Sequence, residues 1–378
     1  MKIVIAPDSF KESLSALEVA DAIAEGWQKV IPDTECICIP MADGGEGTVQ
    51  SLIDATHGRW LSVDVTAPLG NTVRAEFGIS GDGKTAIIEM AAASGLHLVP
   101  IEKRNPLITT SYGTGELIKA ALDQGVAKII LGIGGSATND AGAGMLQALG
   151  AVFWDQDGVA LGFGGGALIN TAHVDFSKLD PRLQQVELDV ACDVNNPLCG
   201  EKGASAIFGP QKGASPEMVA TLDKALHHFA TVIQQQHGLD IRHHAGAGAA
   251  GGMGGGLLTL PNVVLKAGVQ IVIEAVNLAE AIRDADLVIT GEGRMDAQSA
   301  HGKAPIGVAG VAKQFGKPVI AIVGCLREDY EVVYQHGIDA VFPIIRQLGT
   351  LDTVLANGRY NLISAAQNIA KLYQMNMR

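Results

Sequence analysis

Short, continuous apolar runs alternate with stretches of helical spacing at the start of the chain. Residues 2–6 form one such run, residues 15–29 have helical spacing, and residues 35–40 form a second run that leads through a loop into a helix ending at Ala55. Strands covered on both faces read as unbroken apolar runs. The pattern therefore predicts the first β-α-β unit of a doubly wound parallel sheet.

A different pattern begins at Leu61. Residues 61–66 and 72–79 alternate apolar and polar side chains, and the turn sequence PLGN at residues 68–71 separates them. Alternation with a short turn is typical of antiparallel strands that expose one face. We therefore expect a second architecture in the middle of the chain.

Further elements of this middle region are also visible. The best defined is a helix at residues 216–236, with Ser215 as its N-cap and Gly238 just past its end. The others are helices at residues 114–124 and 141–149, a strand at 128–131 and a turn at 155–158.

The opening pattern returns after residue 281. Apolar strands and helical segments follow one another at residues 286–290, 303–315, 318–323, 329–336 and 340–343. Because parallel strands need crossover helices, we expect residues 1–65 and 282–378 to form one discontinuous α/β domain. Residues 66–281 then form an inserted mixed α/β domain.

Composition limits the class of protein. The chain has 378 residues, which favours two domains, and its 47% of hydrophobic residues is enough for sizeable cores. A formal net charge of -13 argues against nucleic acid as a partner. No apolar run reaches the length of a membrane span, and the first one breaks at Pro7, so we expect a cytoplasmic protein with no membrane partner. The five scattered cysteines contain no C-x-x-C pair and favour neither a zinc site nor disulfides. The sequence also leaves a homo-oligomer possible.

One glycine motif matches a known phosphate loop. The sequence GISGDGKT at residues 78–85 satisfies the Walker A pattern. A phosphate loop follows a buried parallel strand, yet the residues before this motif alternate in polarity. We interpret the motif as a hairpin turn.

Two further glycine loops resemble dinucleotide patterns, at residues 132–137 (GIGGSA) and 246–251 (GAGAAG). Chance matches are expected among 47 glycines, so a nicotinamide site is kept only as an alternative. The first loop feeds a predicted helix near Asp140, where free N–H groups and the helix dipole favour an anion.

Polar residues gather where predicted strands end. In open α/β sheets ligands bind at the carboxyl ends of the strands, so the loops after Ala6, Pro40 and Thr290 should face one crevice. These loops offer Asp8, Ser9 and Lys11, then Asp43 and Glu46, and then Glu292, Arg294, Asp296, His301 and Lys303. The segment LDVACDVNNPL at residues 188–198 adds Asp189, Asp193 and Asn195.

Seven motifs in register resemble the glycerate kinase family. They are APDSFKES, MADGGEGT, SYGTGELI, GIGGSATNDAGAG, CDVNNPLCG, GAGAAGGMG and TGEGRMDAQSAHGKAP. The resemblance runs from Asp8 to Pro305 and continues through AIVGC, which is nearly the whole chain. It implies a parallel flavodoxin- or Rossmann-like three-layer domain with an inserted α/β domain, ATP and Mg²⁺ as co-substrates, and 2-phosphoglycerate as the product made from D-glycerate.

Residue chemistry then supplies candidate roles for phosphoryl transfer in an interdomain crevice. Lys11 and Arg294 would hold the glycerate carboxylate, and Ser9 or Asn195 would bind a hydroxyl. Asp8 offers a carboxylate to a proton or a metal, and the acceptor oxygen would be deprotonated or positioned by Asp189 or Asp193. The ATP phosphates would lie on Gly134, Gly135, Ser136, Gly251 and Gly252, and Mg²⁺ near Asp43, Glu46 and Asp296.

Two other classes of function stay open from the residues alone. One is an NAD-dependent oxidoreductase acting on a similar hydroxy acid. The other is a non-catalytic sugar-acid sensor, although no basic helix-turn-helix segment is visible.

Overall fold

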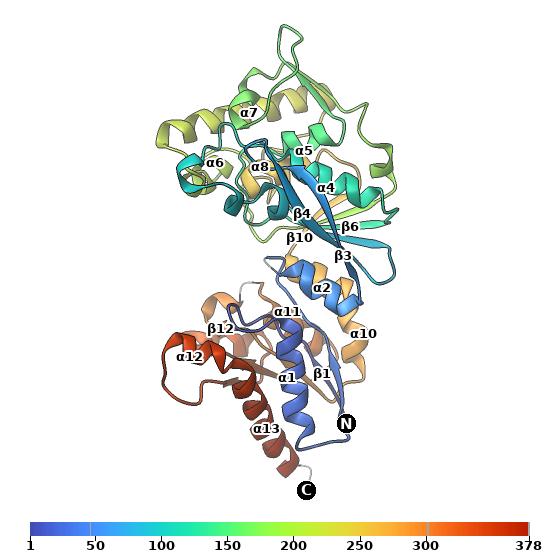
Figure 1. The fold of residues 1–378 in the computed structure, drawn as a ribbon, viewed down its shortest axis with the longest axis vertical. Coiled ribbons are helices and arrows are strands. Elements are labelled where there is room, and N and C mark those ends of the chain that lie inside the picture. The colour runs from blue at the N-terminus through green and yellow to red at the C-terminus, as the bar shows by residue number, and fades with distance from the viewer. Residues whose placement is uncertain (46, 301, 377–378) are drawn as a thin grey trace. The chain divides into compact units, whose positions relative to one another are not determined.

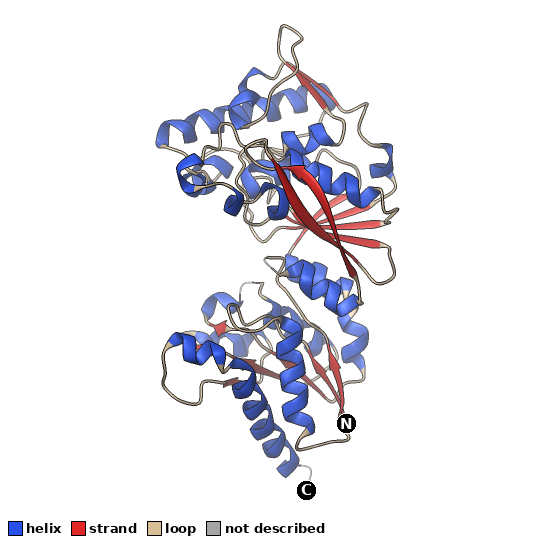
Figure 2. Cartoon of the chain, in the orientation of Figure 1, coloured by secondary structure: helices blue, strands red, loops and turns tan. Residues whose placement is uncertain are grey.

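The chain folds into two units, each built on its own β-sheet (Figure 1, Figure 2). The structure is a computed structural model that describes residues 1–45, 47–300 and 302–376. Unit 1 comprises Met1–His57 and Ala267–Arg378, and unit 2 comprises Gly58–Lys266.

Unit 1 contains five parallel strands. They are β1 (Lys2–Ile5), β2 (Glu35–Cys38), β11 (Leu287–Thr290), β13 (Val319–Val323) and β15 (Ala340–Pro343), in the order β15-β13-β11-β1-β2. Renumbered within the unit and read from the other edge, this order is 2-1-3-4-5, which is the flavodoxin-like arrangement. The expected parallel α/β domain is confirmed.

Helices cover both faces of this sheet because both faces are apolar. On one face α1 (Ala16–Gln28) and α13 (Gly358–Asn376) pack over Ile3 and Ile289. Alternate residues such as Val4 and Val288 point the other way and are equally buried. The remaining helices of the unit are α2 (Thr48–Thr56), α9 (Gly268–Ala275), α10 (Leu278–Arg283), α11 (Ala304–Gln314) and α12 (Leu351–Ala356).

Unit 2 contains a mixed six-stranded sheet. Its order is β10-β9-β6-β5-β4-β3, in which the first four strands are parallel and the last two run antiparallel to their neighbours. The strands are β3 (Arg59–Thr66), β4 (Thr72–Ile79), β5 (Thr85–Glu89), β6 (Lys128–Gly132), β9 (Glu187–Ala191) and β10 (Val263–Lys266). A separate two-stranded antiparallel sheet pairs β7 (Val152–Trp154) with β8 (His173–Asp175).

The helices of unit 2 gather on one side of its sheet (Figure 2). Alternate strand residues such as Ile88, Leu131 and Val190 enter the large core beneath them. The opposite face carries Lys128 and Asp189. The helices are α3 (Ala91–Ser94), α4 (Tyr112–Leu122), α5 (Ala143–Ala148), α6 (Ala204–Phe208), α7 (Pro216–His237) and α8 (Ala249–Leu257).

The division into units differs from the sequence expectation by one strand at the first junction and by the helices α9 and α10 at the second. The pattern predicts junctions at 65/66 and 281/282, whereas β3 pairs along its whole length with β4 in unit 2, and α9 and α10 pack with α11 in unit 1. Local periodicity shows the type of an element but not the sheet that it joins.

Two local expectations have clear outcomes. The motif at residues 78–85 is a turn between β4 and β5, closed by bonds from Ser80 N to Thr85 O and from Gly83 N to Ser80 O. This confirms the hairpin turn. The helical segment expected at 329–336 is a 3₁₀ helix, η7 (Tyr330–His336), rather than an α-helix. Among the described residues no helix combines the length and apolarity needed to cross a bilayer.

Candidate active site

Three loops of unit 1 meet at the carboxyl edge of its sheet. Asp8 N donates to Gly291 O at 2.8 Å, which joins the loops after β1 and β11. Met41 N donates to Pro7 O at 2.9 Å, which joins the loops after β1 and β2. Gly291 also packs closely on the neighbouring strand β13, because a Cβ placed there would lie 1.9 Å from Ile322 O. The loops after Ala6, Pro40 and Thr290 therefore do come together.

Asp8 stands in an acidic cluster on these loops. Burial, followed by the charges of Asp43 and Glu292, raises the pKa of Asp8 to about 7. The N–H of Ser9, which donates to Asp8 Oδ1 at 2.6 Å, and the charge of Lys11 act in the opposite direction. A carboxyl group with a pKa near neutrality can exchange a proton at physiological pH.

Glu292 is the member of this cluster to which the sequence assigns no role. It is only 6% exposed, and its Oε2 accepts a hydrogen bond from Lys303 Nζ at 3.0 Å. Its Oε1 is buried and accepts no hydrogen bond from any residue that the structure describes. Burial raises the pKa of Glu292 as well. The charge density after β11 is the signal that points to it.

Arg294 and Asp296 follow on the same loop. Arg294 lies on β12 (Arg294–Met295), which pairs with β14 (Cys325–Leu326), and its Nε is 3.4 Å from Asp296 Oδ2. Asp296 is buried, and its Oδ1 accepts the N–H of Gln298 at 3.0 Å. The carboxylate therefore orders the turn and holds Arg294, while about half of the arginine side chain stays open to a ligand.

A groove of about 510 Å³ opens beside Asp8. It is lined by the segment from Ser9 to Ser15, including Lys11, and by Gly47. Glu12 holds this segment in a left-handed turn, with φ 65°. The groove is large enough for a small hydroxy acid. Glu46, expected near a metal, lies outside the described residues.

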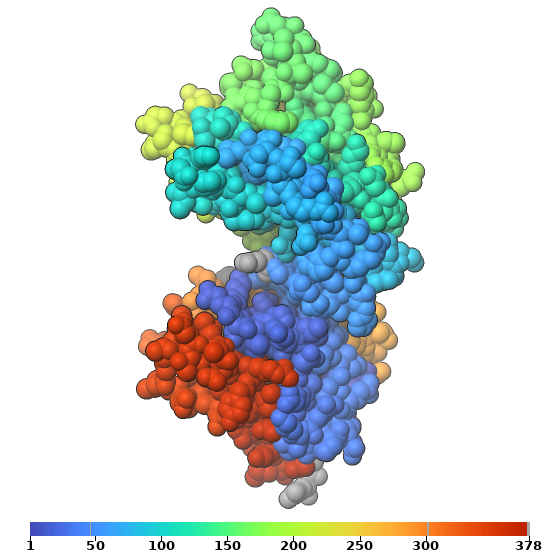
Figure 3. Space-filling model, in the orientation of Figure 1, coloured from blue at the N-terminus to red at the C-terminus, as the bar shows by residue number. Residues whose placement is uncertain are grey.

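The C-terminal segment borders the groove. Ser13 Oγ donates to Leu355 O at 2.7 Å, which fixes the end of α12 to the loop after β1. In Figure 3 the dark blue residues of that loop and the red residues of α12 and α13 form neighbouring parts of the surface of unit 1.

Carboxylates such as those around Asp8 are the ligand type that Mg²⁺ prefers. Within residues 1–45, 47–300 and 302–376, no group of three or more His, Cys, Asp and Glu side chains could hold a metal ion by itself. Mg²⁺ is nevertheless commonly held by one or two carboxylates together with water and substrate phosphates. The repulsion that Asp43 and Glu292 exert on Asp8 is what a cation would relieve.

Asp189, a candidate base, is held by two lysines in unit 2. It lies on β9 and is 4% exposed, and its Oδ2 is 2.5 Å from Lys128 Nζ and 3.1 Å from Lys266 Nζ. The lysines come from the neighbouring strands β6 and β10. This bridge across three strands is a structural arrangement, and Asp189 is not one of the loop residues that gather around Asp8.

Asp193 and Asn195 are exposed in the loop that follows β9. Cys192 N donates to Lys266 O at 2.9 Å, which extends the pairing with β10 up to the start of this loop. Both side chains are thus at a strand end, as expected.

The first glycine loop is closed by groups of its own chain. Asp140 is buried and accepts hydrogen bonds from the N–H groups of Ser111, Gly142 and Gly144, and from Ser111 Oγ. It occupies the place at the start of the short helix α5 where an anion cradle is expected.

Only the tip of that loop remains accessible. Ser136 is buried, and its Oγ accepts a hydrogen bond from the buried Lys212 at 2.6 Å. Gly134 and Gly135 are exposed, and Gly135 has φ 74°. These two glycines are the part of the loop that a phosphate can reach.

Gly251 and Gly252 serve close packing. Both are buried, and a Cβ at Gly251 would lie 1.9 Å from Thr138 O. At Gly252 it would lie 2.7 Å from Leu198 Cδ1 and 3.0 Å from Ala141 Cα. Close packing at these two positions therefore requires glycine, whatever the backbone binds.

The fold and the candidate site define a class of protein: an α/β protein in which charged loops gather where the strands of a flavodoxin-like sheet end. The chain belongs to the glycerate kinase family, whose sequence profile matches residues 3–374.

Full-length relatives and a solved structure agree with this membership. The chain is 68% identical to the glycerate kinase of Haemophilus influenzae, over 98% of each chain. It is 58% identical to the glycerate 2-kinase of Escherichia coli, over 100% of this chain and 99% of that one. A crystal structure from Salmonella typhimurium LT2, assigned provisionally as glycerate kinase 2, matches with a TM-score of 0.93 and 53% identity, over 100% of this chain and 99% of that one.

Proposed function

We propose that the protein transfers the γ-phosphoryl group of ATP to D-glycerate and releases 2-phosphoglycerate and ADP. The family membership and the name of the Escherichia coli relative support this activity. The structural observation that carries it is Asp8, a carboxyl group with a pKa of about 7 beside the groove of Ser9 and Lys11. The comparisons support neither an oxidoreductase nor a non-catalytic sensor.

The groove of unit 1 and the loop after β11 provide groups of the right charge for the acceptor. Lys11 supplies a point charge, and Arg294 a planar fork, for the carboxylate of glycerate. Ser9 can hydrogen-bond a hydroxyl group of the same molecule. We also propose Asp193 and Asn195 as contacts to the hydroxyl groups of glycerate, because they lie on an exposed loop at a strand end.

The transfer itself needs a proton acceptor. Asp8 takes the proton from the 2-hydroxyl as that oxygen forms its bond to the γ-phosphorus. The bond between the γ-phosphorus and the β,γ-bridging oxygen breaks, and ADP leaves with its electron pair. Asp189 is a poor alternative base because it is buried within β9 between Lys128 and Lys266 and does not lie at a strand end.

Asp43 is the residue we propose to hold Mg²⁺ with the nucleotide, since it contributes to the repulsion at Asp8. When bound, the ion neutralises charge that develops on the phosphoryl oxygens. Asp296 orders the neighbouring turn and keeps Arg294 in place. The proposal also assigns the protein to the breakdown of organic and sugar acids in the cytoplasm.

One assay tests the activity. The purified protein is given ATP, Mg²⁺ and a panel of small hydroxy acids; ADP release is followed, and phosphorus NMR locates the phosphate on the product. We expect D-glycerate to be the preferred acceptor and 2-phosphoglycerate to be the product. ADP release that does not depend on glycerate, or a phosphate on the 3-hydroxyl, would contradict the proposal.

A further inference from the structure

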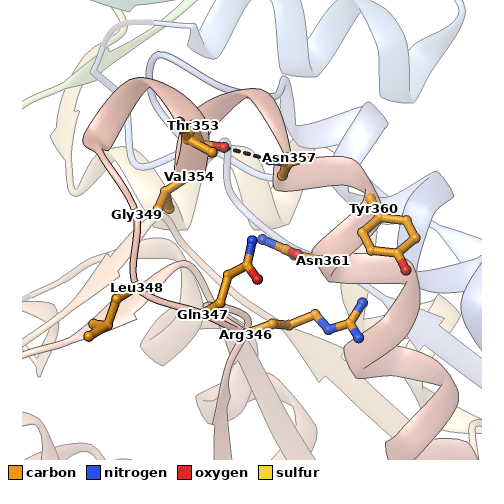
Figure 4. A pocket seen from close by; sticks show the side chains of 9 residues that line it. All are labelled: Arg346, Gln347, Leu348, Gly349, Thr353, Val354, Asn357, Tyr360 and Asn361. Carbon is orange, nitrogen blue, oxygen red and sulfur yellow. Dashed lines mark hydrogen bonds between the residues drawn. The ribbon is translucent and has the colours of Figure 1, made fainter.

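A second cavity of unit 1 lies at the same edge of the sheet as the acidic cluster. It has a volume of about 300 Å³, and its lining comes from the loop after β15 and from the helices α12 and α13 (Figure 4). Small-molecule sites have volumes of roughly 300–1,000 Å³, so the cavity suits a compact ligand group. No role described so far uses these residues.

The lining has a flat wall and two amide groups. The Arg346 guanidinium carbon lies 5.1 Å from the centre of the Tyr360 ring. Figure 4 shows the side-chain amides of Gln347 and Asn361 turned toward the same space. Each amide offers both a donor and an acceptor, and a cation stacked on an aromatic ring provides a planar surface.

This combination suits a nucleobase. A purine has a flat face for stacking and an edge of alternating donors and acceptors. A carboxylic acid or a free phosphate would leave the acceptors of Gln347 and Asn361 without donors. Leu348 and Val354 complete the lining with apolar surface.

The position of the cavity agrees with a nucleotide whose phosphates reach Asp8. β15 is three strands away from β1 in the sheet, a span of about 14 Å at the usual strand spacing, comparable to an extended nucleoside triphosphate. α12 links the two places, because it lines the cavity through Thr353 and is bonded to the groove loop through Ser13 Oγ and Leu355 O.

From the composition of this cavity and its place on the sheet edge, we infer that Arg346, Gln347, Tyr360 and Asn361 form the adenine-binding site for ATP. The inference rests on the proposed function for the identity of the nucleotide. It adds the residues that recognise the base.

The test compares variants of the full-length protein. Tyr360→Ala removes the stacking surface and Gln347→Ala removes one amide, and both side chains are exposed enough for folding to persist. Leu351→Ala and Arg359→Met are matched controls on the same two helices, because neither residue lines the cavity and Arg359 pairs with Glu25. Isothermal titration calorimetry with ATP and with inorganic triphosphate gives affinities directly, and steady-state kinetics gives KM for ATP and for glycerate.

We expect Tyr360→Ala to weaken ATP binding about tenfold, since stacking of a base on an aromatic ring is worth roughly a tenfold or larger change in affinity. Gln347→Ala should weaken it several-fold and narrow the preference for ATP over GTP. Affinity for inorganic triphosphate and KM for glycerate should stay as in the wild type, and the controls should leave all constants unchanged.

Two results would overturn the inference: an ATP affinity within twofold of the wild type in both variants, or an equal loss of ATP and triphosphate affinity. The wild-type assay with glycerate is separate. A wild type that binds ATP but phosphorylates another acid would reject the proposed acceptor and leave the adenine site standing.

Discussion

Lys212 Nζ lies 2.6 Å from both Ser136 Oγ and Thr138 O, inside unit 2. The lysine is 1% exposed, and burial lowers its pKa from 10.5 to about 7, while the charge of Asp140 acts in the opposite direction. A buried amine thus ties the glycine loop to the turn at residues 210–212.

This relationship predicts a pH-dependent stability. Because the pKa of Lys212 is lower in the folded state than in the unfolded state, the stability that this lysine contributes is complete above pH 10.5. It is lost as the pH falls toward 7. The unfolding free energy of the wild type minus that of Lys212→Met should therefore increase from pH 7 to pH 10, by up to about 1.4 kcal/mol per unit. Urea titrations at several pH values measure it.

The control for this prediction is Lys29→Met, which removes an exposed lysine paired with Glu25. The difference in unfolding free energy between the wild type and Lys29→Met should change little from pH 7 to pH 10. A flat difference for Lys212→Met would show that the lysine stays charged inside the fold.

The glycines of the two loops should respond differently to alanine. Gly251→Ala brings a Cβ within 1.9 Å of Thr138 O at φ 68°, so we expect a loss of more than about 3 kcal/mol of stability. Gly134→Ala meets no atom within 4 Å, and its stability should stay within about 0.5 kcal/mol of the wild type. Thermal and urea unfolding compare the two, and the kinetics of Gly134→Ala with ATP then report on phosphate contact without a folding defect. A stable Gly251→Ala protein would contradict the packing role.

Much of unit 1 follows from the sequence because its signals are local. Ser15 and Glu18 form the capping box that starts α1, and each apolar run becomes a strand at nearly the expected residues. The three strand-end loops converge because a parallel sheet brings the carboxyl ends of its strands to one edge.

The role of the glycine loops depends on partners that are distant in the sequence. The local sequence around residues 132–140 favours an anion site, but the carboxyl group of Asp140 itself accepts the N–H groups there. Lys212 and the partners of Asp189 lie on other elements, far along the chain, and no periodicity predicts them. The same limit explains why the junctions between the units differ from the sequence expectation by β3 at one end and by α9 and α10 at the other.

A substitution of Asp189 tests whether this residue stabilises the fold or takes part in catalysis. We expect Asp189→Asn to lose roughly 1–3 kcal/mol of stability, because two partly buried lysines would face each other without a carboxylate. At a temperature where the variant is folded, kcat should remain near the wild-type value. Denaturant unfolding and steady-state kinetics on one preparation separate the two effects.

An exposed ion pair on the same sheet is the control. Asp64→Asn breaks the pair with Arg74, whose side chain is 60% exposed, and should change stability by less than about 0.5 kcal/mol. Removing one lysine should also relieve the defect, so Lys128→Met combined with Asp189→Asn should be less unstable than the sum of the single changes. A fall of kcat by two orders of magnitude in a stable Asp189→Asn protein would return Asp189 to the chemistry.

Substitution of Asp8 should change both the stability and the activity of the protein, because the pKa of this residue affects both. Since burial and the charges of Asp43 and Glu292 raise the folded-state pKa from 3.8 to about 7, its contribution to stability is complete below pH 4 and is lost as pH rises through 7. Without Mg²⁺ or nucleotide, the unfolding free energy of Asp8→Asn should therefore rise relative to that of the wild type as the pH increases from 4 to 7. The rise should be at most about 4 kcal/mol, and smaller where solvent screens the charge. Asp21→Asn, which removes an exposed carboxylate of α1, should show no such trend.

The same substitution should abolish most of the activity. A lost proton acceptor typically costs about 10²–10⁴ in rate, so kcat of Asp8→Asn should fall by that factor while ATP still binds. Mg²⁺ added at pH 8 should stabilise the wild type more than the variant, because the ion relieves a repulsion that asparagine has already removed. If Asp8→Asn keeps its kcat but shows the predicted gain in stability, the acidic cluster binds the cation and the proton acceptor must be another residue, with Asp193 the next to test.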